Sequence, residues 1–82
     1  FNLGEVLSLT GRPAEAVVAF RQASRLNPDD AETQAGLAAA LEATGAREEA
    51  ADTWSRVVAS GDVVLAARAE ERLRALRASA GD

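Results

Sequence analysis

The chain of 82 residues contains no cysteine, histidine, lysine, tyrosine or methionine. Without cysteine it can form neither a disulfide nor a thiolate metal site. The other absences remove the usual general base near neutral pH, the Schiff-base amine and the phenolic acid. The glycines occur singly, so no phosphate-binding loop is present in the sequence. We therefore expect no enzymatic activity, no cofactor and no bound metal.

Aromatic residues are scarce: there are two phenylalanines and one tryptophan. Runs of β-branched residues are equally rare, whereas alanine is abundant, a composition that favours closely packed helices over a sheet. The length allows one small domain, residues 1–82. Apolar runs fall far short of the roughly 18 residues that a membrane span needs. We expect a soluble protein without membrane insertion, cytoplasmic rather than periplasmic or extracellular. Since no methionine begins it, we expect it to be part of a longer protein.

The net charge is −4, from 13 acidic and 9 basic residues, and every basic residue is arginine. Residues 1–61 carry the whole excess of acid, and residues 62–82 are neutral. Nucleic-acid binders present a basic stripe that neutralises phosphates. No such stripe exists here, so nucleic acid is excluded as an expected partner.

The chain repeats itself with a period of 34 residues. This offset aligns Leu3 with Leu37, Leu7 with Leu41, Thr10 with Thr44, Gly11 with Gly45, Glu15 with Glu49, Ala16 with Ala50, and Phe20 with Trp54. A period between 20 and 50 residues is typical of stacked arrays, in which each unit buries its apolar face against the next.

Each unit has the pattern helix, tight turn, helix. Gly11 and Gly45 suit the left-handed backbone that ends a helix, and Pro13 suits the first turn of the following one. The second helix of each unit then carries an apolar stripe at i, i+4 and i+7, which comprises Ala16, Phe20 and Ala23 in the first unit and Ala50, Trp54 and Val57 in the second. We assign Trp54 to the core rather than to an exposed binding surface, because it aligns with Phe20.

The segment from Leu26 to Glu32 marks the junction between units. Pro28 stops one helix, and Asp29 or Asp30 can cap the next, with Glu32 in its first turn. Helix capping accounts for these three acids, so we prefer it to a cation site. Residues 62–79 are predicted to form one further helix with Asp62 as its N-cap. Its predicted buried stripe comprises Ala66, Ala69, Leu73 and Leu76, and its polar outer face comprises Arg68, Arg72, Arg74 and Arg77 beside Glu70 and Glu71.

These positions resemble the tetratricopeptide repeat family. The resemblance rests on the leucine and small-residue pairs, the turn glycines, the small alanines, the large aromatics and the closing proline: Leu3 with Gly4, Leu37 with Ala38, Gly11, Gly45, Ala16, Ala50, Phe20, Trp54, Ala23 and Pro28. It implies an all-α fold, a right-handed superhelical stack of antiparallel helix hairpins. We expect a truncated first repeat at 1–30, a second repeat at 31–61, and a capping helix at 62–79.

The resemblance also implies a function, the binding of a peptide or protein segment in a concave groove lined by the first helix of each unit. Carried over to this sequence, the expected groove residues are Phe1, Glu5, Ser8, Leu9, Glu32, Ala35, Ala39, Glu42, Arg68, Glu71 and Arg72. We expect this groove to be shallow and acidic, and to favour an apolar or basic segment. Phe1, Glu5 and Gly36 stand where the co-chaperone subgroup places its carboxylate-binding residues, so that specialised use is not expected.

The alternative function is structural. About three repeats are normally needed for a stable array, and this chain has about two. Its open N-terminal end, with Leu3 and Leu7, could pair with another copy and give a homo-oligomer. The sequence leaves both functions open.

Overall fold

The computed structural model describes residues 11–80, and the side chains of residues 11–78. Four helices follow one another: α2 (Pro13–Leu26), α3 (Ala31–Thr44), α4 (Arg47–Ala59) and α5 (Val63–Ala80). No strand occurs in this described part of the chain. The predicted helix over 62–79 is therefore present with its bounds moved by one residue.

Local signals in the sequence set the helix ends. Gly45 adopts the left-handed conformation, with φ of 86°, and ends α3. Pro13 is the first residue of α2, as its fixed φ and missing N–H predict. Asp30 caps α3: its Oδ1 accepts the Glu32 N–H at 3.1 Å and its Oδ2 accepts the Thr33 hydroxyl at 2.9 Å. Asp62 similarly accepts the Leu65 N–H at 3.0 Å before α5.

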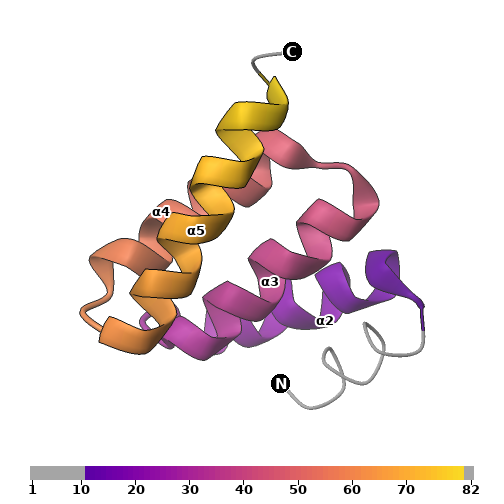
Figure 1. Cartoon of the computed structure of the whole chain (residues 1–82). Helices are drawn as coiled ribbons and strands as arrows, with labels where there is room; N and C mark the ends of the chain where they lie inside the picture. The colour runs from indigo at the N-terminus through magenta and orange to yellow at the C-terminus, as the bar shows by residue number, and fades with distance from the viewer. Residues whose placement is uncertain (1–10, 81–82) are drawn as a thin grey trace.

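Each helix packs against its neighbour in the chain. The pairs α2 with α3, α3 with α4, and α4 with α5 make extensive contacts, whereas α3 and α5 touch each other only slightly. Figure 1 shows the consecutive helices running antiparallel, so that α3 and α5 begin at the same end of the molecule. Two helices that lie apart in sequence thus face each other without close packing.

The core lies between these helices and follows the predicted stripe. Ala16, Ala50 and Val57 are fully buried, and Phe20 and Trp54 are only 3% and 2% exposed. The small alanines let the helix axes approach, and the aromatic rings fill the space beside them. The assignment of Trp54 to the core is confirmed.

Three positions of the predicted stripes are less buried than expected. Ala23 in α2, and Ala66 and Leu76 in α5, are partly exposed, while Ala69 and Leu73 are buried. Ala23 lies in the last turn before Leu26, and Ala66 lies in the first turn of α5. A helix that crosses its neighbour at an angle loses contact toward its ends, and this accounts for the partial exposure.

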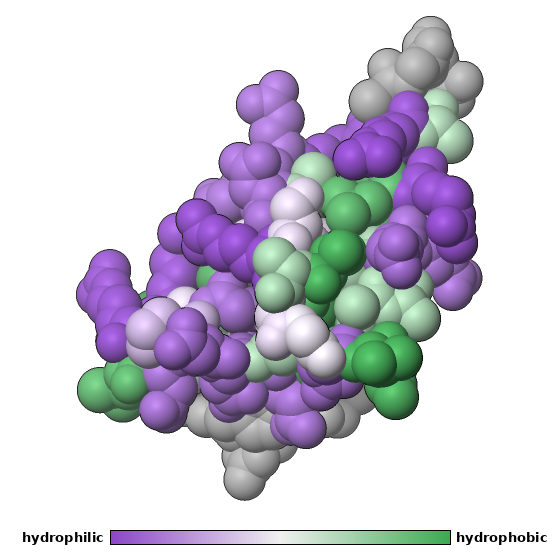
Figure 2. Space-filling model, turned by 90° about the vertical axis from the view of Figure 1, so that its left-hand side faces the viewer, coloured by the Kyte–Doolittle hydropathy of each residue, from purple (hydrophilic) through white to green (hydrophobic). Residues whose placement is uncertain are grey.

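Hydrophilic side chains cover much of the face shown in Figure 2. Figure 2 shows one face on which apolar residues form a strip between hydrophilic side chains. Among residues 11–78, the exposed large apolar side chains are Val18, Leu26, Val63 and Val64.

Candidate binding groove

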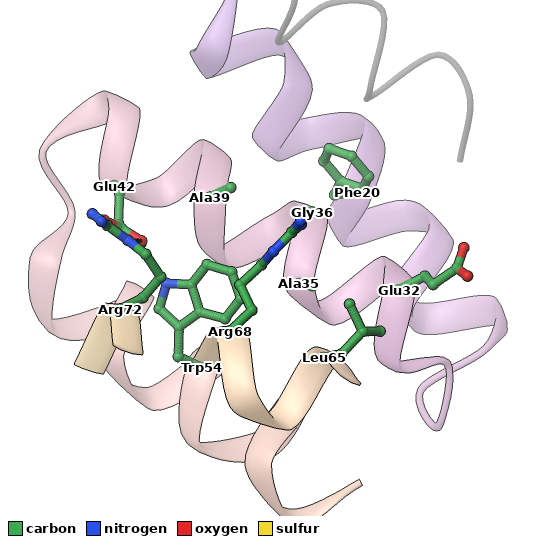
Figure 3. Close-up of a pocket in the computed structure, with 10 residues that line it drawn as sticks. All are labelled: Phe20, Glu32, Ala35, Gly36, Ala39, Glu42, Trp54, Leu65, Arg68 and Arg72. Carbon is green, nitrogen blue, oxygen red and sulfur yellow. Dashed lines mark hydrogen bonds and ion pairs between the residues drawn. The ribbon is translucent and has the colours of Figure 1, made fainter. Parts of the chain in front are cut away.

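A hollow of about 540 Å³ lies between α3 and α5 (Figure 3). All four helices contribute to it. Its lining residues are Phe20 from α2, Glu32, Ala35, Gly36, Ala39 and Glu42 from α3, Trp54 from α4, and Leu65, Arg68 and Arg72 from α5. We call this hollow the groove.

The groove exists because α3 presents small residues toward α5. Ala35, Gly36 and Ala39 share one face of α3 at the spacing i, i+1 and i+4. These side chains are small, and α3 and α5 both pack on α4 while making few contacts with each other, so a space remains between them. The buried rings of Phe20 and Trp54 therefore border an open, apolar space.

Gly36 lets α2 approach α3 closely at the edge of the groove. A Cβ atom at this position would overlap the Phe20 ring, with Cζ only 2.5 Å away. Carbon atoms do not approach so closely, so the ring occupies space that any other residue at 36 would need. The glycine therefore fixes how α2 packs behind the groove.

The Glu42 carboxylate joins three helices at one end of the groove. Its Oε2 accepts the indole N–H of Trp54 at 2.5 Å and the Nε–H of Arg72 at 3.3 Å. A terminal guanidinium nitrogen of Arg72 donates to Oε1. The Glu42 side chain is only 14% exposed, whereas that of Arg72 is 45% exposed. The hydrogen bond to Glu42 and the charge of this carboxylate raise the pKa of Arg72 above its usual value.

The other two charged residues of the groove have no ion pair within the described part of the chain. Arg68 reaches from α5 toward α3 beside Gly36, and Glu32 lies at the end near Leu65 (Figure 3). The groove thus holds two carboxylates and two guanidinium groups. The expectation of an acidic groove is wrong for these residues, because Arg68 and Arg72 balance Glu32 and Glu42.

Most of the predicted groove residues that the structure describes lie together. Six of them line the hollow, namely Glu32, Ala35, Ala39, Glu42, Arg68 and Arg72. Glu71 is exposed on α5 and does not line it. Phe1, Glu5, Ser8 and Leu9, like Leu3 and Leu7 of the proposed open end, lie outside the described residues. Arg68 and Arg72 are exposed, as predicted for the polar face of the last helix, and they also line the groove.

Sequence reasoning missed four lining residues: Phe20, Gly36, Trp54 and Leu65. Phe20 and Trp54 were assigned only to the core, since they lie on the second helix of each unit. The signal that could have found them is the run of small residues on α3, whose short side chains let the edges of large rings behind them border the groove. Gly36 was noticed only as a departure from the carboxylate-binding subgroup.

A family model described as tetratricopeptide repeat matches residues 9–67. The chain belongs to the tetratricopeptide repeat family. The all-helical structure agrees with the superhelical repeat fold of this family, whose repeats are typically protein–protein interaction modules. No curated protein and no solved structure matches the sequence.

Among the described residues, no helix combines the length and the apolar character needed to cross a bilayer. The same residues contain no cluster of three or more acidic, histidine or cysteine side chains placed to hold a metal ion.

Proposed function

We propose that this tetratricopeptide repeat chain is a non-catalytic binding module whose groove between α3 and α5 holds a segment of a partner protein. The observation that carries the proposal is the apolar hollow over two large buried rings. Ligand sites are typically concave, mostly apolar and about 300 to 1,000 Å³ in volume, with a few polar groups at defined places. The groove has this volume and this composition.

Aromatic rings at the base of the groove favour a protein partner. Tryptophan is enriched among the residues that contribute most to protein–protein binding, especially where neighbouring residues exclude water from it. Trp54 is held in place by the Glu42 carboxylate, so its ring needs no reordering when a segment binds. Such preorganisation lowers the entropic cost of association.

The test blocks the groove without disturbing the fold. Ala39 is exposed on α3 and lines the groove, so Ala39→Arg places a long side chain across it. Ala75 is exposed on α5 and does not line the groove, so Ala75→Arg is the matched control. Both variants add the same side chain and the same charge to the exposed surface of a helix.

The assay selects binders of the protein from a displayed library of random peptides and measures their affinity for both variants. We expect binders that lose at least tenfold in affinity for Ala39→Arg and keep it for Ala75→Arg. They should also change the emission of Trp54, the only tryptophan in the chain. Binders that tolerate Ala39→Arg, or failure to obtain any binder, would count against the groove.

A further inference from the structure

The four charged side chains along the groove differ in whether they already have a partner within the described part of the chain. Glu42 and Arg72 close one end, where Glu42 accepts hydrogen bonds from both Arg72 and Trp54, and Arg72 is paired with Glu42. A partner that engaged either of them would first have to break these contacts. Arg68 and Glu32 have no ion pair in residues 11–78, so their charges are open to a bound segment.

The positions of these two open charges follow from helix geometry. Glu32 lies about 15 Å along α3 from Glu42, and Arg68 lies about 6 Å along α5 from Arg72. Since Glu42 and Arg72 meet, Glu32 and Arg68 are separated by roughly 9 Å along the groove. Figure 3 shows the same order, with Arg68 between the Glu42–Arg72 pair and Glu32.

The space between the open charges is apolar. Ala35 and Gly36 line it from α3, and Leu65 lines it from α5. Binding an apolar side chain here is favourable, because it removes apolar surface from water. Binding a charged side chain here is unfavourable, because the charge would lose hydration without gaining a partner. The groove therefore offers an anion, an apolar space and a cation in sequence.

We propose that the bound segment carries a basic and an acidic side chain on either side of an apolar one, with the basic group against Glu32 and the acidic group against Arg68. This proposal rests on the proposed function, since it names the chemistry of the segment that the groove holds. It differs from the apolar or basic segment that the sequence predicts, because Arg68 repels a purely basic one.

Short blocked peptides provide the test. The probe is acetylated and amidated Lys-Ala-Leu-Ala-Glu, in which an extended backbone puts the charged residues and the leucine on one face, with its ends about 13 Å apart. This distance exceeds the spacing of Glu32 and Arg68 along the groove, and the flexible lysine and glutamate side chains can make up the difference. Three comparison peptides replace both end residues by lysine, by glutamate or by glutamine. Capped ends remove the terminal charges, so the side chains alone differ.

Affinity is measured by NMR titration of the protein, with the indole N–H of Trp54 as the reporter at the groove. Each exposed ion pair contributes little, so the mixed peptide should bind only about two- to fivefold more tightly than the glutamine peptide. The lysine-only and glutamate-only peptides should gain less over the glutamine peptide, because each meets one repulsive charge. High salt should reduce these differences.

A charge reversal then separates the groove from general electrostatics. In the Glu32→Arg variant both open charges are positive, so the glutamate-only peptide should become the tightest binder. Glu48 is exposed in the first turn of α4 and does not line the groove. Glu48→Arg changes the net charge equally and should leave the mixed peptide tightest.

The possible failures are distinguishable. If the four peptides bind equally, or if Glu32→Arg leaves their order unchanged, the charge pattern is wrong while the groove still binds segments. If no peptide shifts the Trp54 signal at all, this proposal and the proposed function both fail.

Discussion

The indole N–H of Trp54 in α4 donates to the carboxylate of Glu42 in α3 at 2.5 Å, across twelve positions in the sequence. The same carboxylate also binds Arg72 in α5, which lies thirty positions after Glu42. A residue predicted only as core thus shares a polar contact with two residues that the sequence placed in the groove.

Removing the indole should cost much of the stability of so small a domain. Trp54→Ala deletes a ring that is 2% exposed, and we expect a loss of about 3 to 5 kcal/mol in the free energy of unfolding. Trp54→Phe keeps an aromatic ring and should lose less, mainly the hydrogen bond to Glu42. Urea denaturation followed by circular dichroism measures both. A loss below about 1 kcal/mol for Trp54→Ala would contradict the buried position.

Gly36→Ala should destabilise the fold although alanine is the better helix former. The added methyl group overlaps the Phe20 ring, and overpacking typically costs about 1 to 3 kcal/mol, more than the gain of up to about 1 kcal/mol in helix propensity. Thermal unfolding measures the change. The smaller side chain in Phe20→Leu should recover part of the loss in the double variant. If the two effects simply add, the proposed overlap is not their cause.

Glu42 should matter more than Arg72, because Glu42 is nearly buried and serves two partners. Glu42→Ala leaves the Trp54 N–H unpaired and should cost about 1 to 3 kcal/mol. Arg72→Gln removes the half-exposed guanidinium but leaves the indole bond to Glu42, and it should cost less than about 1 kcal/mol. Glu42→Gln, which keeps an acceptor for the indole, should resemble Arg72→Gln. Equal losses for Glu42→Ala and Arg72→Gln, measured by urea denaturation, would mean that the indole bond contributes nothing.

Asp30 and its neighbour provide a matched test of helix capping. Asp30→Ala removes the acceptor for Glu32 and Thr33 and should lower the free energy of unfolding by about 0.5 to 2 kcal/mol. Asp29→Ala makes the same chemical change one residue earlier, outside the cap. It should change the free energy of unfolding by less than about 0.5 kcal/mol. Equal losses in thermal unfolding would exclude a specific cap at Asp30.

Self-association remains a separate prediction from the sequence. Since about two repeats offer fewer stacking interfaces than the usual three, we expect the chain to form oligomers or exchange helices at high concentration. Sedimentation equilibrium over a range of concentrations tests this. A well-folded monomer at millimolar concentration would contradict it.

The helices and the core were predictable because they depend on local rules. Gly45 ends α3 through its own backbone conformation, and Asp30 caps α3 through atoms two and three residues away. Likewise, the alignment of Phe20 with Trp54 needed only the 34-residue period to place both rings in the interior. Phe1, Glu5, Ser8 and Leu9 stay predictions, since they lie outside the described residues.

The sequence by itself determined that this chain folds into stacked helix pairs, because caps, turns and apolar periodicity act within a few residues and recur in both units. Only the tertiary structure decided what the groove contains. The distance between α5 and α3 determines whether Glu42 meets Arg72 beside Trp54. It also determines whether Arg68 and Glu32 stay unpaired. That separation is set by how α3 and α5 each pack against α4, and no local pattern in α3 or α5 specifies it.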